Sequence, residues 1–152
     1  MFEKLFAKKE EPPRPRDPDF GALVSSPGKF PGQVRWIGIG AFPPTGTEIT
    51  YQLGGVPKGP TDGHRAAFHA IVEHYAEFYV TALPLLAEQL KANLGTLEPG
   101  DLKDLFVPVS LWVPDEEVGP DMEWDMSFRC DAAGKTYSVD FKCWEAVSAE
   151  EE

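Results

Sequence analysis

Cysteine, histidine and long apolar runs are scarce in this sequence, and each shortage excludes a class of protein. Two cysteines, Cys130 and Cys143, cannot build a disulfide scaffold. No run approaches the roughly 20 apolar residues that span a membrane, and the first residues lack the apolar core of a secretory signal. No nucleotide, metal or catalytic motif stands out. We therefore expect a cytoplasmic protein of bacterial type that is not an enzyme and has no cofactor or metal.

Basic residues are also few, and the excess negative charge is concentrated in the last third. The formal net charge is -11, and residues 101–152 hold fourteen acidic residues against four basic ones. Such a surface repels nucleic-acid phosphates and attracts basic proteins. We expect a protein partner with a basic surface and no nucleic acid, although solubility alone also explains an acidic surface.

Composition divides the chain into three regions. Residues 1–18 are rich in proline and predict a flexible N-terminal arm, whose short apolar and basic start could touch a membrane only weakly. Residues 19–147, in a chain that is 42% apolar, can fill the core of a single α+β domain. Residues 148–152 predict a frayed acidic tail.

The longest periodic segment runs from Thr61 to Leu94, where apolar residues recur at three- and four-residue steps. This stripe predicts a helix with one buried face, capped at its start by Thr61 or Asp62. Pro84 lies inside the pattern and predicts a kink or a break near Leu83, because proline removes one helical hydrogen bond.

Strand patterns lie on both sides of this helix. Residues 20–24, 34–39 and 47–53 precede it, and their short loops predict an antiparallel meander. Apolar residues alternate through 105–113, where Phe106 and Trp112 are expected on the same face, opposite Leu105 and Val107. Pro108 lacks an amide, which predicts an edge strand or an unpaired nitrogen.

Residues 122–130 and 135–143 form the clearest hairpin pattern. The apolar residues are even-numbered in the first strand and odd-numbered in the second, so they share one face only if the numbers of opposed residues sum to an odd value. A loop over residues 131–134 satisfies this condition. This register pairs Cys130 with Lys135, Phe128 with Tyr137 and Trp124 with Phe141. Cys143 then lies opposite Met122, far from Cys130, so we expect two free buried thiols. The predicted fold is an α+β antiparallel sheet of about six strands, three before and three after, packed on one long kinked or broken helix.

Function is expected on whatever the helix leaves uncovered. Phe106 and Trp112 would form an apolar patch rimmed by acids, which is typical of a protein-binding hot spot. The acidic run nearby lacks the ligand order of a calcium loop, so a solvated or partner-binding loop is favoured. The candidate partner-binding residues are Phe106, Trp112, Asp115, Glu116, Glu117, Asp121, Glu123 and Asp125.

Two alternatives remain open. Asp62 and His64 at the helix start could form a ligand site of a small-molecule or metal-binding enzyme, although a capped helix end explains them more simply. The three histidines cannot share a metal, because a spacing of five residues turns each by about 140° around the helix. A structural domain, including a homodimer through an edge strand, is the other alternative.

The order of these segments resembles a group of small uncharacterised bacterial domains. The motifs that carry it are DPDFGAL at residues 17–23, VRWIGI at 34–39, the long aromatic helix and the closing hairpin at 124–147. Some members of this group lie beside polymorphic toxins as immunity-like proteins. The resemblance implies a protein-binding module, such as an inhibitor of a basic nuclease toxin, and it supplies no catalytic residues.

Overall fold

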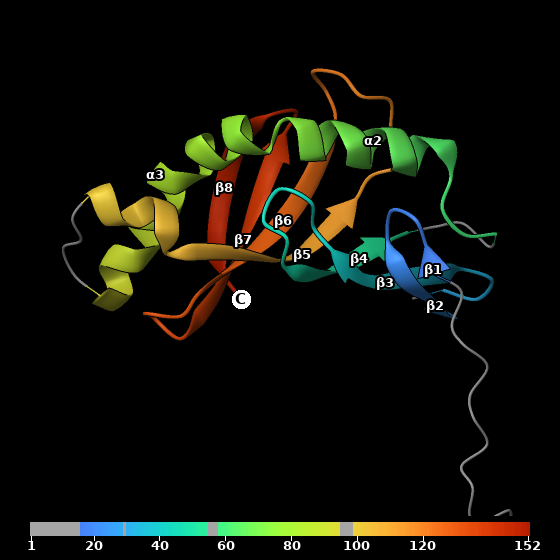
Figure 1. The fold of residues 1–152 in the computed structure, drawn as a ribbon, viewed down its shortest axis with the longest axis horizontal. Coiled ribbons are helices and arrows are strands. Elements are labelled where there is room, and N and C mark those ends of the chain that lie inside the picture. Colours follow the sequence, from blue (N-terminus) through green and yellow to red (C-terminus); the bar gives the residue numbers. More distant parts are fainter. Residues whose placement is uncertain (1–15, 29, 55–57, 95–98) are drawn as a thin grey trace, which may run out of the picture.

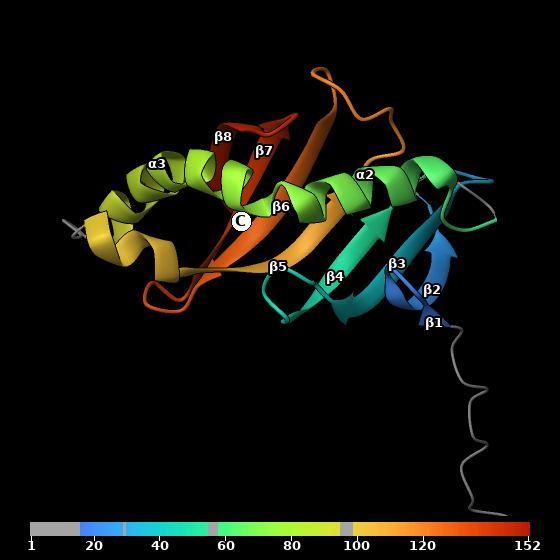
Figure 2. The ribbon, with the colours of Figure 1, turned by 45° about the horizontal axis from the view of Figure 1, so that its top comes forward.

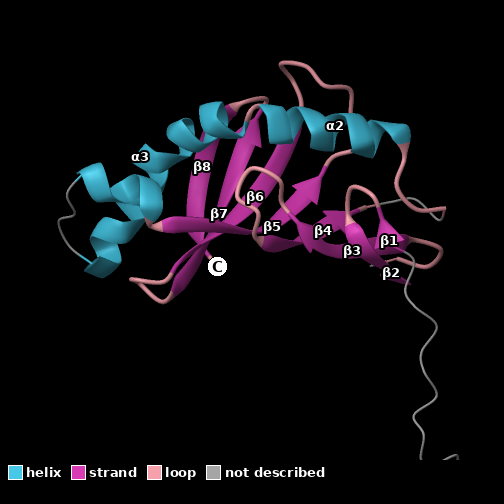
Figure 3. Cartoon of the chain, viewed as in Figure 1, coloured by secondary structure: helices cyan, strands magenta, loops and turns pink. Residues whose placement is uncertain are grey.

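The computed structural model describes residues 16–28, 30–54, 58–94 and 99–152. Four described strands precede the helices and four follow them (Figures 1 and 3). The strands are β1 (Arg16–Asp17), β2 (Gly21–Pro27), β3 (Val34–Ala41), β4 (Glu48–Leu53), β5 (Phe106–Val113), β6 (Glu123–Cys130), β7 (Lys135–Lys142) and β8 (Glu145–Glu151). The helices are α2 (Asp62–Glu73), α3 (Tyr75–Leu94) and the short 3-10 helix η1 (Pro99–Asp104).

All described strands belong to one eight-stranded sheet, arranged in chain order from β1 to β8. Neighbouring strands are antiparallel except β4 and β5, which run parallel. The helices explain this exception. They carry the chain from the end of β4 back to the end of the sheet where β4 begins, so β5 runs in the same direction as β4. The predicted six-stranded antiparallel sheet on one long helix is therefore wrong: the sheet is mixed, it has two further strands, and two helices pack on it.

Both helices lie on the same face of the sheet (Figures 1 and 2). The core lies between these layers, and the apolar helix stripe contributes to it as predicted: Phe68, Ile71, Phe78, Ala82, Leu86 and Leu90 are buried. Phe78 is the centre of an aromatic cluster, with its ring centroid 4.7 Å from that of Trp124 and 5.0 Å from that of Phe141. No helix in the described part of the chain is long and apolar enough to cross a membrane.

The helical segment divides at His74, nine residues before Leu83, where the break was predicted. His74 has φ -97° and ψ 11°, and its ring stacks on that of Trp144 at 4.2 Å. By contrast, Pro84 lies inside α3. The carbonyl that loses its donor there belongs to Val80, whose residue is 63% exposed, so water can replace the missing amide. Ring stacking at His74 therefore marks the break, and the proline is tolerated.

Strand β5 contains a β-bulge that reverses its alternation. Pro108 pairs with Phe128 and Ser110 pairs with Ser127, so the register shifts between them and leaves Val109 unpaired. Phe106 therefore lies on the core face, 4% exposed, whereas Trp112 beyond the bulge lies on the other face and is 37% exposed. The prediction that Phe106 and Trp112 share a face is wrong, because one extra residue moves every later side chain to the opposite face. Strand β5 is central rather than at an edge, but β4 pairs with it only from Ser110 onward, so Pro108 has no partner among the described residues on the β4 side, in keeping with the predicted unpaired nitrogen.

The β6–β7 hairpin has the predicted register. Cys130 pairs with Lys135, Phe128 with Tyr137 and Trp124 with Phe141. Gly134 takes the left-handed conformation, with φ 64°, in the four-residue loop. The Cys143 amide donates to the Met122 carbonyl at 2.7 Å, which confirms their expected proximity. Both cysteines are free, but only Cys130 is fully buried, and Cys143 is half-buried.

The two ends of the sheet correct the predicted domain boundaries. Strand β1 falls within the predicted arm, and Arg65 of α2 holds it through ion pairs to Asp17 at 2.6 Å and Asp19 at 2.8 Å. Residues 1–15 of that arm lie outside the described residues. The predicted frayed tail is strand β8, whose outer edge is bonded by α3: the Ala146 amide donates to Thr81 Oγ1, and Gln89 donates to the Ala149 carbonyl. Edge bonding of this kind blocks pairing with another strand.

Candidate functional site

The sheet face opposite the two helices, called the open face below, carries one row of directly opposed residues. Backbone pairing joins Ile37 to Gln52, Gln52 to Trp112, Trp112 to Asp125 and Asp125 to Asp140. Because side chains alternate along every strand, all five point away from the core. The row therefore crosses strands that are far apart in the sequence.

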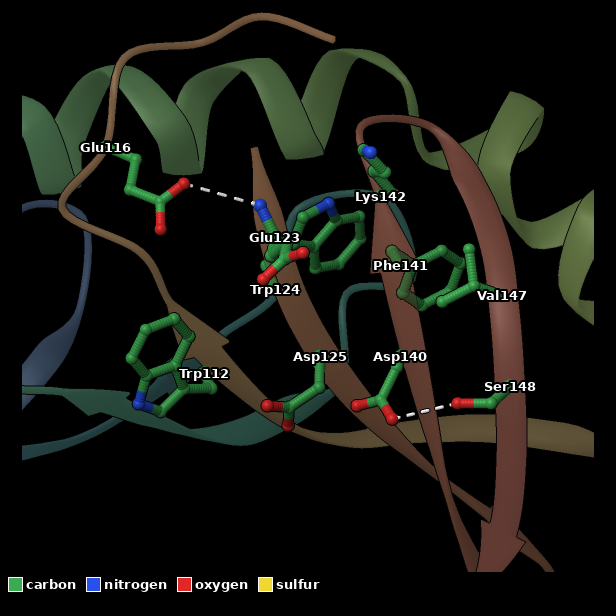
Figure 4. Close-up of a pocket in the computed structure, with 10 residues that line it drawn as sticks. All are labelled: Trp112, Glu116, Glu123, Trp124, Asp125, Asp140, Phe141, Lys142, Val147 and Ser148. Carbon is green, nitrogen blue, oxygen red and sulfur yellow. Dashed lines mark hydrogen bonds between the residues drawn. The ribbon is translucent and has the colours of Figure 1, made fainter. Parts of the chain in front are cut away.

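A hollow of about 470 Å³ lies at the β5–β8 end of this face (Figure 4). Its walls come from these strands and from the loop over residues 114–122. Most of its polar lining is acidic, and its residues include Trp112, Glu116, Glu123, Asp125, Asp140 and Lys142. We call this site the acidic hollow.

Asp125 and Asp140 are opposed like charges in the acidic hollow. Asp140 accepts a hydrogen bond from the Ser148 hydroxyl at 2.9 Å. In the described part of the chain, no hydrogen bond or ion pair reaches the Asp125 carboxylate. Burial raises the pKa of Asp125, and the charges of Asp140 and Glu152 act in the same direction. The site therefore holds negative charge that the surrounding side chains do not neutralise.

One of the residues that line the hollow, Lys142, is basic. Its ammonium is 3.9 Å from the carboxylate of Asp121, and both side chains are largely exposed. An exposed pair at this distance contributes little, because water screens it. Lys142 therefore leaves the Asp125–Asp140 pair available to a cation from outside.

The acidic loop divides its carboxylates between two places. Asp115 accepts a hydrogen bond from the Thr61 hydroxyl at 2.7 Å and lies against Gly63, so it faces the start of α2. Glu116 lines the hollow, and its carboxylate is 3.4 Å from the Glu123 amide, which donates to it. Glu117 and Asp121 are exposed on the same loop. Asp115 thus anchors the loop, and Glu116 extends from it toward the sheet.

Four of the predicted partner-binding residues meet in the acidic hollow: Trp112, Glu116, Glu123 and Asp125. Phe106 does not, because the bulge in β5 places it in the core, with its ring 6.3 Å from that of Tyr137. Asp140 and Ser148 were not predicted. The hairpin register already implied that Asp140 opposes Asp125, whereas Ser148 depended on recognising β8 as a strand.

The alternative ligand residues at the start of α2 have structural contacts. His64 is 1% exposed, and its Nδ1 accepts the Thr61 amide at 3.1 Å, while the His64 amide donates to Thr61 Oγ1 at 3.1 Å. These reciprocal bonds form a capping box, with histidine in the place that glutamate or glutamine usually takes. Burial lowers the pKa of His64; Asp115 opposes this shift and Arg65 reinforces it. Asp62 is exposed beside this cap.

Metal-ligand geometry is absent from the part of the chain that the structure describes, where no three His, Cys, Asp or Glu side chains are placed to hold an ion. The acidic hollow combines a half-exposed indole with carboxylates on two neighbouring strands. That combination can contact a cation through both the aromatic face and hydrogen bonds. Comparison with protein-family models, curated proteins and solved structures gives no match for this chain.

Proposed function

We propose that this chain is a protein-binding module, an inhibitor of the immunity-like kind, that captures a partner with a basic surface. The observation that carries this proposal is the acidic hollow, where Trp112 lies beside the opposed carboxylates of Asp125 and Asp140. A cationic side chain entering it would relieve the repulsion between these carboxylates. Binding energy at protein interfaces is concentrated at such aromatic and charged anchors.

Charge on a larger scale supports the same partner chemistry. The formal net charge of -11 lies mostly in residues 101–152, and four of the acidic residues in this range, Glu116, Glu123, Asp125 and Asp140, line the hollow. A negative field of this extent speeds the encounter with a basic protein and makes association sensitive to salt. The loop over residues 114–122, which the Asp115–Thr61 contact ties to α2, adds Glu116 to the same surface.

The test compares two double variants that remove the same charge from opposite faces. Asp125→Asn with Asp140→Asn empties the hollow of its central charges, whereas Glu73→Gln with Glu88→Gln neutralises exposed helix residues. Tagged protein is used to capture partners from a lysate of the source cells at low and moderate salt, and captured proteins are identified by mass spectrometry.

The expected result is one basic protein in stoichiometric amount that the wild type and the helix variant retain and the hollow variant loses. Rising salt should release it from the wild type, because counterions screen surface attraction. Equal retention by the hollow variant would exclude the hollow as the binding site. Failure of the wild type to retain any basic protein would contradict the proposed function itself.

A further inference from the structure

The acidic hollow is one end of a longer surface on the open face. The opposed row continues beyond Trp112 through Gln52 to Ile37 and Val24 on β3 and β2. Val24 is 38% exposed and Ile39, on the neighbouring row, is 44% exposed. The face therefore changes from mainly aliphatic at β2–β3, where Arg35 also lies and donates to Gln52 at 3.1 Å, to acidic at β6–β7, with an indole between the two ends.

The row beside this one is built from small side chains. Backbone pairing joins Ile39 to Thr50, Thr50 to Ser110, Ser110 to Ser127 and Ser127 to Ser138. Thr50 and Ser110 are only partly buried and leave room above β4 and β5. At β6, Ser127 is 4% exposed, and its hydroxyl donates to the Glu152 carboxylate, so the last residue of the chain covers this row beside Asp125.

The open face presents side chains, whereas the backbone groups of its central strands are engaged within the sheet. A partner segment lying on it must therefore satisfy its own backbone hydrogen bonds, which an α-helix does everywhere except in its first and last turns. The opposite face of the same sheet already binds helices in this way, since α2 and α3 lie across its strands (Figure 2).

Resting on the proposed function, we propose that the open face binds an amphipathic helix of the partner, with aliphatic residues against Val24, Ile37 and Ile39 and an arginine in the acidic hollow. Strands lie about 4.8 Å apart, so Ile37 is roughly 14 Å from Asp125 and roughly 19 Å from Asp140. Eleven helical residues span about 16.5 Å and make three turns to within about 20°. The aliphatic residue and the arginine are therefore eleven positions apart.

Arginine fits the hollow better than lysine. Its planar guanidinium has five donors, so it can bond the carboxylates of Asp125 and Asp140 together, whereas an ammonium is a single point charge. The same plane can stack on the ring of Trp112, which precedes Asp125 in the row. The partner helix is thus held by a stacked and bridged cation at one end and by aliphatic contact at the other.

The probe is a synthetic alanine- and glutamine-rich helical peptide, labelled with a fluorophore, that carries two leucines one turn apart and an arginine eleven positions after the first. A control peptide of identical composition has the arginine nine positions after it, which turns the side chain by about 180° around the helix. A third peptide replaces the arginine with lysine. Fluorescence anisotropy measures each dissociation constant against wild-type protein.

We expect the eleven-position peptide to bind about tenfold more tightly than the nine-position control, and several-fold more tightly than the lysine peptide. Asp125→Asn with Asp140→Asn should remove the preference for arginine. Val24→Thr with Ile39→Thr keeps β-branched residues in the strands and should weaken the eleven-position peptide several-fold. Glu73→Gln with Glu88→Gln should leave all three constants unchanged.

Equal binding of the two arginine registers would overturn the helix inference, and so would a lack of detectable binding. If that equal binding still depended on Asp125 and Asp140, the proposed function would stand and the helix would be wrong. Binding that ignored the Asp125→Asn and Asp140→Asn changes would count against both.

Discussion

Replacing Asp125 with asparagine should stabilise the fold at neutral pH. Asp125 is directly opposed to Asp140, and no ion pair or hydrogen bond within the described residues neutralises it. Directly opposed like charges on a sheet destabilise by about 0.2–1 kcal/mol, and asparagine removes one of the two charges while keeping the size of the side chain. For a chain of this length, such a gain raises the melting temperature by up to about 4 °C.

The stability gained by Asp125→Asn should be larger at neutral pH than at acidic pH. Burial, Asp140 and Glu152 raise the pKa of Asp125 in the folded protein, so the folded state binds more protons than the unfolded state in this range. Asp125 therefore does not destabilise the wild type below its unfolded pKa of about 3.9. The destabilisation develops as the pH rises through the pKa of Asp125 in the folded protein. The advantage of Asp125→Asn should be present at pH 7 and absent near pH 3.5.

Urea denaturation of wild type and variant at pH 7 and pH 3.5 measures both quantities. Glu73→Gln is the matched control, because this exposed helix residue has no opposed carboxylate across a strand pair. High salt should reduce the gain at pH 7 by screening the repulsion. An Asp125→Asn protein that is less stable than wild type at pH 7 would refute the argument that repulsion is stored at this site.

Three further changes test the elements that position the site. His64→Ala should cost about 1–2 kcal/mol by removing the capping box, and His64→Gln should restore much of it, because glutamine can occupy this place. Since burial lowers the pKa of His64 in the folded protein, wild-type stability should fall as the pH drops below the unfolded value of about 6.5, and the glutamine variant should lose this slope. Phe78→Ala should cost about 3–5 kcal/mol by opening a cavity among four aromatic rings. Arg65→Met should cost about 1.5–3 kcal/mol by leaving Asp17 without its partner.

Denaturant unfolding measures the stability lost in the His64, Phe78 and Arg65 variants, and hydrogen exchange shows where in the fold the Arg65→Met loss occurs. Arg65→Met should speed amide exchange in β1 and β2 more than in β6 and β7, and uniform acceleration would show that the ion pair does not act locally. A flat pH profile in wild type would contradict the account of His64. A Phe78→Ala cost below about 1 kcal/mol would mean that the aromatic cluster repacks around the gap.

Local pattern was sufficient for the β6–β7 hairpin. Alternation told which side chains share a face, and the four-residue loop with Gly134 then left one register, because a slip by one residue would expose every apolar side chain. The same register implied that Asp125 opposes Asp140, so half of the acidic hollow was predictable. Thr61 as the helix cap was predictable for a similar reason, since capping depends on neighbours in the chain.

Strand β8, the bulge in β5 and the break between the helices involve contacts between segments that are distant in the sequence. Residues 145–151 have no clear alternation, and they form β8 because β7 offers an unpaired edge and Thr81 and Gln89 of α3 bond the other side. The bulge at Val109 could not be read from alternation, which runs without interruption through this segment, so Phe106 was placed on the wrong face. The break at His74 coincides with ring stacking on Trp144, a residue seventy positions away.

The sequence by itself determined the helical stripe, the alternating strands, the hairpin register and the concentration of acidic charge, because each depends on residues that are close in the chain or on composition alone. The hairpin register also implied the Asp125–Asp140 pair, and only the tertiary structure decided what joins it. Trp112 lies beside the pair because β5 pairs with β6, and Glu116 joins it because Asp115 ties its loop to the start of α2. The physical reason is that backbone pairing and side-chain anchoring between segments place these charges, and neither follows from local pattern.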